Sequence, residues 1–245
     1  MELKIAQKLV LAALAFSGAA FAQTKAPEPD YTLAFNAGLV TDYRYRGISQ
    51  SRLKPAVQAG IDWTHKSGFY LGTWGSSIKW IKDAGGDAPI EMDFYGGYRF
   101  EFSGIAFDAG LLRYQYFNHD LAVSPNTTEA YIAATASVLT VKYSHSLTDT
   151  FGFANSKSSY YLDASMLFDL GNGWSVVPHA GYQKIKNFKP GSYSDYSLAI
   201  NKDFGNGFIG SATIVGTDSD SGVYFTPSGK HTGKTGLVLG VKYNF

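Results

Sequence analysis

Apolar and polar residues alternate along this chain, most clearly from Tyr31 to Arg46. Every second residue from Tyr31 onward is mostly apolar or aromatic, and the residues between are small, polar or charged. A period of two predicts a β-strand with two unlike faces. The pattern is long enough to cross a bilayer when tilted, and aromatic residues lie near both ends of its apolar face. We therefore expect a membrane strand with its apolar face outward.

The same alternation recurs along the chain and predicts about twelve strands. They span 31–46, 56–65, 69–80, 90–100, 105–112, 129–138, 140–147, 160–170, 174–183, 195–201, 208–214 and 236–245. The assignment of residues to faces is open over 69–80 and again over 112–117. In the second range, either a bulge or lumen-facing side chains of Tyr114 and Tyr116 would fit the pattern.

The connections between these strands are alternately long and short. Long loops outside and short periplasmic turns are typical of an outer-membrane barrel, and Gly171-Asn172-Gly173 and Gly205-Asn206-Gly207 predict two of the tight turns. Strands satisfy all backbone groups in lipid only when their sheet closes. The fold class predicted is therefore all-β: a transmembrane, antiparallel, up-and-down β-barrel.

The first residues predict an export signal. Lys4 and Lys8 precede an apolar run from Leu9 to Ala20, and Ala20-Phe21-Ala22 forms a small-x-small cleavage site before Gln23. The run is too short to span a membrane comfortably. The predicted segments are a signal peptide (1–22), a periplasmic lead-in (23–30) and a barrel in the cell outer membrane (31–245).

The amino-acid composition excludes several classes of functional site. The chain has no cysteine, which excludes disulfides, thiolate metal sites and a thiol nucleophile. Its five histidines show no zinc spacing, and a net charge of +1 gives no basis for nucleic-acid binding. We expect no metal and no cofactor. Aromatic residues at 16% and 27 glycines fit many short strands separated by turns.

The polar faces of the strands supply candidate pore residues. These candidates are Asp42, Arg44, Arg46, Asp62, Glu91, Asp93, Arg99, Asp108, Glu129, Lys142 and Asp163. When Asp169, Asp195 and Lys242 are included, the interior is more acidic than basic. Because rings of acid attract cations and about twelve strands enclose little space, we expect a narrow and weakly cation-preferring pore.

Two groups of these charges have competing interpretations. Arg44 and Arg46, at the outer end of the first strand, either form the basic side of a constriction or pair with lumen carboxylates such as Glu91 or Asp93. Arg99 and Asp108 lie on strands joined by a short turn. They are expected to form a structural ion pair, diagonal across that hairpin.

Part of the sequence resembles a known family. Residues 36–77, NAGLVTDYRYRGISQSRLKPAVQAGIDWTHKSGFYLGTWGSS, resemble the opening hairpins of TorF-type porins, most strongly at 42–47 and 68–72. The ending 241–245, with Tyr243 and Phe245, resembles the signal that outer-membrane barrels present to the barrel assembly machinery. The resemblance implies a transport barrel in contact with outer-membrane lipids. It implies neither a substrate nor catalytic residues.

The function expected is passive passage of small solutes or ions through a porin-like channel. Two alternatives in the membrane are a barrel-type lipid hydrolase and a structural or adhesive barrel without a pore. Catalysis is disfavoured because His145 and its neighbours Ser144 and Ser146 point to opposite faces, and the chain has no Gly-x-Ser-x-Gly motif. His119-Asp120 falls in a loop. A soluble, lipocalin-like barrel would reverse the two faces of every strand.

Overall fold

The computed structural model describes residues 29–245, so the predicted signal peptide and most of the predicted lead-in lie outside the described residues. The strands are β1 (Tyr31–Val40), β2 (Arg44–Tyr45), β3 (Ile48–Ser49), β4 (Ala56–His65), β5 (Phe69–Ser77), β6 (Ile90–Phe102), β7 (Ile105–Gln115), β8 (Thr127–Ala136), β9 (Leu139–Ser146), β10 (Tyr160–Met166), β11 (Phe168–Gly171), β12 (Trp174–Lys184), β13 (Tyr193–Gly205), β14 (Phe208–Thr217) and β15 (Gly236–Asn244). The described helical turns are α2 (Trp80–Asp83) and the 3-10 turn η1 (Lys189–Gly191).

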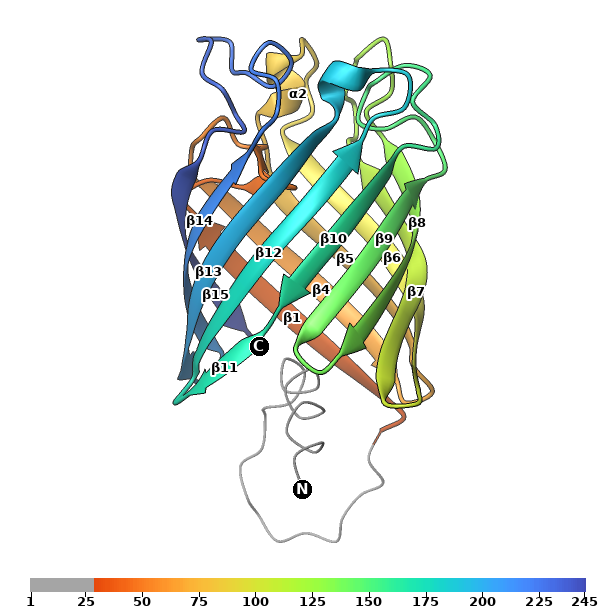
Figure 1. Cartoon of the computed structure of the whole chain (residues 1–245), viewed down its shortest axis with the longest axis vertical. Coiled ribbons are helices and arrows are strands. Elements are labelled where there is room, and N and C mark those ends of the chain that lie inside the picture. Colours follow the sequence, from red (N-terminus) through yellow and green to blue (C-terminus); the bar gives the residue numbers. More distant parts are fainter. Residues whose placement is uncertain (1–28) are drawn as a thin grey trace, which may run out of the picture.

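These strands form one closed antiparallel barrel (Figure 1). The sheet holds 13 strands, and β10 and β11 follow each other along the same edge of β12, so twelve strands make up the wall. The first and last strands close it, with Asn36 opposite Asn244 and Val40 opposite Gly240. The predicted all-β, twelve-strand, up-and-down barrel is confirmed.

The outer wall is apolar and the inner wall is polar. On β1, Leu33 and Leu39 are 51% and 52% exposed, because they point away from the barrel. Large apolar side chains on the other strands of the wall are exposed in the same way, while Tyr70 and Tyr161 point inward and are buried. In a soluble barrel this apolar surface would face water, at a free-energy cost of about 25 cal/mol per Å² of exposed area. The arrangement is that of a lipid-facing wall and excludes the lipocalin-like alternative.

The two ends of the barrel differ. Short turns connect strands at one end, for example at Asn172 and Asn206, whose backbones have positive φ angles of 51° each. Longer segments, including α2 and η1, lie at the other end (Figure 1). Residue 245 lies at the short-turn end, where its backbone N–H donates to the carbonyl of Phe35 at 3.0 Å. Within residues 29–245, no helix has the length and hydrophobicity required to cross a membrane.

The structure changes the ends of two predicted strands and resolves one open choice of faces. The first strand ends at Val40 rather than at Arg46, because the chain turns into the lumen there. The third ends at Ser77 and is followed by α2. The pairing of β6 with β7 runs without a register shift, so the open choice over 112–117 resolves to lumen-facing Tyr114 and Tyr116 and not to a bulge.

Candidate functional site: a hairpin in the lumen and the cavity beside it

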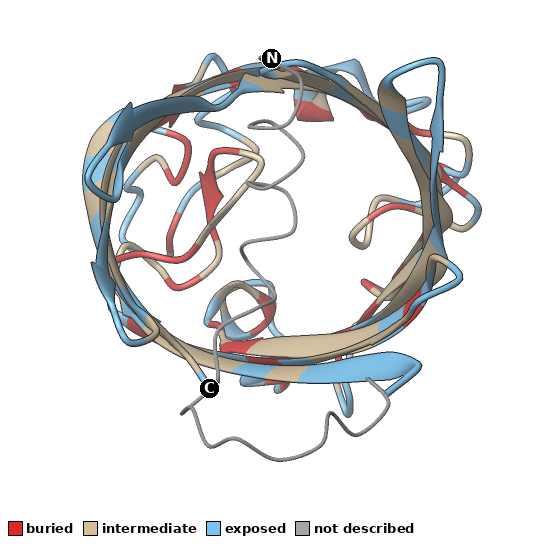
Figure 2. Cartoon of the chain, turned by 90° about the horizontal axis from the view of Figure 1, so that it is seen from below, coloured by how far each residue is buried: buried red, intermediate tan, exposed pale blue. Residues whose placement is uncertain are grey.

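Residues 41–55 fold into the barrel, and we call this segment the lumen hairpin. Its two short strands, β2 and β3, pair with Tyr45 opposite Ile48, which leaves Arg46-Gly47 as the connecting turn. Both turn residues have positive φ, 47° and 77°, as a type I′ turn requires. A Cβ on Gly47 would lie 2.4 Å from Cγ2 of Thr217, so only glycine fits there. Seen along the barrel in Figure 2, buried segments lie inside the ring of strands.

Arg46 fastens the tip of the lumen hairpin to the opposite wall. Its Nη2 lies 2.7 Å from Oε2 of Glu129, and its Nη1 donates to Oε1 of Glu129 at 3.1 Å and to Oε1 of Gln183 at 2.6 Å. The guanidinium also lies over the ring of Tyr161, 4.2 Å from the centroid. The side chains of Arg46 and Glu129 are 5% and 1% exposed. This is a buried, two-point ion pair, the strong form of charge-assisted hydrogen bonding.

Tyrosine hydroxyls make the second attachment. Tyr43 of the lumen hairpin donates to Oε1 of Glu91 at 2.5 Å, and Tyr116, just beyond β7, donates to Oε2 at 2.6 Å. Burial, and after it the charge of Glu91, raises the pKa of both Tyr43 and Tyr116, so both keep the proton that they donate. The hydroxyl of Tyr45 contacts that of Tyr114. The hairpin is thus held at several points.

Arg44 stabilises the hairpin from within. Its Nε lies 2.5 Å from Oδ2 of Asp42, and its Nη1 donates to the carbonyls of Gly47 and Lys234 at 3.0 Å each. Asp42 also accepts from Ser49 at 2.5 Å. Both arginines therefore pair with carboxylates, as one of the two interpretations expected, but with Asp42 and Glu129 instead of the examples given, Glu91 and Asp93. The inward fold of residues 41–55 brings Arg44 to Asp42 and Arg46 to Glu129 instead.

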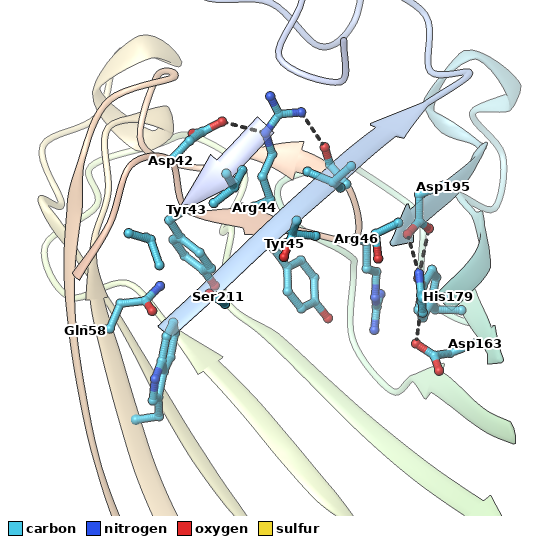
Figure 3. Close-up of a pocket in the computed structure, with 18 of the residues that line it drawn as sticks. Asp42, Tyr43, Arg44, Tyr45, Arg46, Gln58, Asp163, His179, Asp195 and Ser211 are labelled. Carbon is cyan, nitrogen blue, oxygen red and sulfur yellow. Dashed lines mark hydrogen bonds and ion pairs between the residues drawn. The ribbon is translucent and has the colours of Figure 1, made fainter. Parts of the chain in front are cut away.

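A cavity of about 620 Å³ lies beside the lumen hairpin (Figure 3). Of the eleven candidate pore residues, those that line it are Asp42, Arg44, Arg46, Lys142 and Asp163. The six others, Asp62, Glu91, Asp93, Arg99, Asp108 and Glu129, do not. Glu91 and Glu129 hold the hairpin, whereas Asp62 accepts from Tyr95 at 2.6 Å elsewhere on the inner wall. Asp93 is buried, and its Oδ1 has no hydrogen-bond partner among residues 29–245.

Arg99 and Asp108 form the predicted ion pair, with different geometry. They lie directly opposite each other in the pairing of β6 with β7, not diagonally, and Nε of Arg99 is 3.2 Å from Oδ2 of Asp108. The side chains are 48% and 28% exposed, so the pair adds little stability. Tyr70 donates to the other oxygen of Asp108 at 2.5 Å.

A cluster around His179 was not predicted from the sequence. Its Nε2 lies 2.9 Å from Oδ2 of Asp163, and its Nδ1 lies 3.5 Å from Oδ1 of Asp195. Tyr161 donates to Oδ2 of Asp195 at 2.9 Å. Alternation places these residues on the inner face, but only the register of β10, β12 and β13 shows that they meet. In the described part of the chain, no group of histidine and acidic side chains has an arrangement suited to a metal ion.

One serine and histidine contact lies in a loop rather than on a strand of the wall. In the loop after β14, Oγ of Ser219 is 2.8 Å from Nε2 of His231 and 2.7 Å from Oγ1 of Thr217. Ser219 is buried, and among residues 29–245 no carboxylate forms a hydrogen bond with His231. The contact ties the loop together. His145, the histidine weighed from the sequence, bonds to the hydroxyl of Tyr143 at 3.1 Å, while Ser144 points inward.

The two residues of the predicted assembly signal lie at the short-turn end. The ring of Tyr243 packs against Phe208 and Phe245, with centroids 4.6 and 4.7 Å apart, and Phe245 is 70% exposed.

The fold and the lumen place this protein among barrels of the porin type, and the solved structures agree. A KdgM porin is 10% identical, covers 87% of this chain and 98% of its own, and superposes with a TM-score of 0.56. A second structure of that protein was solved in complex with disordered oligogalacturonate. A NanC porin is 8% identical over 87% of this chain and 99% of its own, also with a TM-score of 0.56. At such identities the likeness shows the fold alone.

The family itself is shown by sequence. A family model described as a bacterial protein of unknown function, Gcw_chp, matches residues 24–245, and the chain belongs to that family. None of the curated proteins matches the chain. The narrower TorF-type resemblance is not confirmed by these matches.

Proposed function

We propose that the protein is a channel for passive passage of small solutes across the outer membrane, with the lumen hairpin as its constriction. The observation that carries the proposal is the polar cavity of about 620 Å³ beside that hairpin, inside a barrel whose outer wall is apolar. A barrel that served only as a structural element could have its polar interior filled by side chains, as in small eight-stranded barrels, whereas this one leaves open space. The Ser219 and His231 contact does not support the catalytic alternative, because no carboxylate within the described residues 29–245 orients the imidazole.

Two features make the proposed channel narrow. Twelve strands enclose less space than the sixteen or eighteen of open porins, and the lumen hairpin occupies part of what remains. The hairpin is fixed by buried pairs rather than lying loosely in the lumen. Solutes would therefore pass between its side chains and the polar inner wall.

Ion preference is the finer part of the proposal. The charge count predicts a weak preference for cations, but several counted carboxylates are already engaged: Asp42 by Arg44, Glu129 by Arg46 and Asp108 by Arg99. An engaged carboxylate adds less to the field along the lumen. The reversal potential of the open channel under a salt gradient measures this preference directly.

Location and assembly belong to the same proposal. The small-x-small site before Gln23 supports export, and the apolar outer wall supports contact with outer-membrane lipids. We assign Tyr243 and Phe245 to recognition by the barrel assembly machinery, which agrees with their place on or next to the last strand.

The test is permeation by the purified barrel. Proteoliposomes should swell in isotonic solutions of small polyols and not of large oligosaccharides, and planar bilayers should show discrete conductance steps. A folded barrel, identified by its heat-dependent mobility in gels, that passes neither solutes nor ions would refute the channel. Lipid hydrolysis by such a preparation would instead establish the enzyme.

A further inference from the structure

We infer that the lumen cavity holds a binding site for a hydroxylated carboxylate, with Lys142 binding the carboxylate group. The inference rests on the proposed channel function and deepens it by naming a solute class. Lys142 projects from β9 into the cavity. Among residues 29–245, the other carboxylates and arginines that line the cavity each contact a side chain of opposite charge or, for Asp163 and Asp195, the imidazole of His179, and Lys142 has no such partner.

The surroundings of Lys142 leave its ammonium group incompletely satisfied. Its Nζ lies 4.0 Å from the centroid of the Tyr131 ring, a cation–π contact. An ammonium has three N–H donors, and the face of one ring cannot accept all of them. Because a partly dehydrated charge is costly without a partner, an anionic group in the cavity would be bound through charge-assisted hydrogen bonds.

The carboxylate opposite Lys142 on the neighbouring strand does not bind its ammonium group. Asp163 lies directly opposite Lys142 in the pairing of β9 with β10, yet the two side chains form no ion pair. Asp163 is engaged by His179 instead, with Nε2 2.9 Å from Oδ2. The ammonium group of Lys142 is therefore available to a solute, and Asp163 has its own hydrogen-bond partner in the imidazole.

The rest of the wall offers hydroxyl and amide groups. Five polar side chains that line the cavity form no hydrogen bond with another described residue: Gln58, Ser144, Ser197, Ser211 and Thr213. Ser144 is the next inward residue after Lys142 on β9, about 7 Å along the strand. Free donors and acceptors of this kind match the hydroxyls of a polyol. A simple inorganic anion would satisfy Lys142 and leave them unused.

Cavity size is compatible with such a solute. The volume of about 620 Å³ lies within the range of small-molecule sites, and the engaged charges around it resist rearrangement. The structure thus points to one cationic contact and several hydroxyl contacts. Sugar acids and related hydroxylated carboxylates combine the two.

The experiment uses gluconate as probe, with acetate and glucose as partial probes. Each is titrated into the folded, detergent-solubilised barrel by calorimetry and, separately, into the chamber during bilayer recording. Lys142→Met is compared with Lys242→Met, a matched loss of a lysine that does not line the cavity. Lys142→Arg keeps the charge. Folding of each variant is checked by heat-dependent gel mobility.

We expect gluconate to bind and to reduce the current, and Lys142→Met to weaken both effects about tenfold, the value of one charged hydrogen bond. Lys242→Met should match the wild type, and Lys142→Arg should retain most of the affinity. Acetate or glucose binding as tightly as gluconate would overturn the combined site. If the barrel conducts but wild type and Lys142→Met bind gluconate equally well, the Lys142 binding site is refuted and the channel function stands. If the folded barrel binds gluconate but does not conduct, the channel function is refuted and the binding site stands.

Discussion

Arg46 and Glu129 are 83 positions apart in sequence and form a buried two-point ion pair across the lumen, with Nη2 and Oε2 2.7 Å apart. Glu129 stands on β8, five strands around the wall from β1 in the order β1-β4-β5-β6-β7-β8. The pair therefore joins the tip of the lumen hairpin to the far side of the barrel. It fixes the position of the proposed constriction.

Removal of one partner of this pair should be costly. Glu129→Ala leaves the Arg46 guanidinium buried without its carboxylate, and we expect a loss of about 3–5 kcal/mol in the free energy of unfolding. The measurement is urea unfolding of the barrel in detergent. Asp30→Ala, which removes a largely exposed pair with Lys66, is the control and should change little. Equal effects of the two substitutions would show that the buried pair does not hold the hairpin.

The two faces of β10 should differ sharply in their tolerance of arginine. Leu162 points outward and is 46% exposed, whereas Ser165 shares the inner face with Asp163. Leu162→Arg at mid-strand should destabilise the barrel by about 2–4 kcal/mol, because lipid cannot hydrate the charge. Ser165→Arg should cost far less, since the lumen can. Urea titrations in lipid vesicles measure both, and similar losses would mean that the faces are reversed.

Gly181 provides room for Tyr161, which lies under the Arg46 guanidinium. A Cβ on Gly181 would lie 2.0 Å from Oη of Tyr161. Gly181→Val should therefore displace that ring and destabilise the barrel by about 1–3 kcal/mol. Ala180→Val, on the outward face of the same strand, should be close to neutral. Thermal unfolding followed by gel mobility compares them, and an unchanged Gly181→Val barrel would contradict the packing described.

Loop 218–235 should loosen in acid. Burial, and after it the charge of Arg44, lowers the pKa of His231 below 6.5, with Asp220 opposing weakly. The folded loop thus favours the neutral ring, and the open loop binds a proton more readily. The neutral His231 ring therefore contributes its full stabilisation of the ordered loop above pH 6.5. This stabilisation is lost as the pH falls through the lowered pKa of His231.

Hydrogen exchange at the Thr232 amide, which donates to the carbonyl of Tyr224 at 2.9 Å, reports this change. After correction for intrinsic rates, its protection should fall with pH in the wild type. His231→Gln should show a flatter profile. Identical profiles would exclude His231 as the titrating group.

The barrel was predictable from sequence because each wall strand has unlike faces, and the period of two reports this directly. Leu33, Phe35 and Leu39 were correctly placed outward on that basis. The lumen hairpin was not predicted, because the same alternation continues through residues 41–46. A hairpin packed against the inner wall also has two unlike faces, so its pattern mimics a longer membrane strand. The signal available was Arg46-Gly47, which suits a two-residue turn.

The partners of the lumen charges could not be obtained from the sequence. Arg46 meets Glu129 only because the barrel closes and the hairpin crosses the lumen, and His179 meets Asp163 and Asp195 through strand register. Neither relationship is encoded in local spacing. The sequence therefore indicated which charged residues face inward, but it did not show which of them form pairs.

Whether the lumen hairpin is the constriction is decided by the single-channel conductance of the wild type and of a variant in which a Gly-Gly linker replaces residues 43–49. The variant removes Arg46 and the tyrosines that fasten the hairpin, while the wall strands remain. We expect discrete conductance steps in the wild type and clearly larger steps in the variant, both in folded barrels. Equal conductance in the two would show that the lumen hairpin is not the constriction, and a folded wild type without conductance would show that the barrel is not a channel.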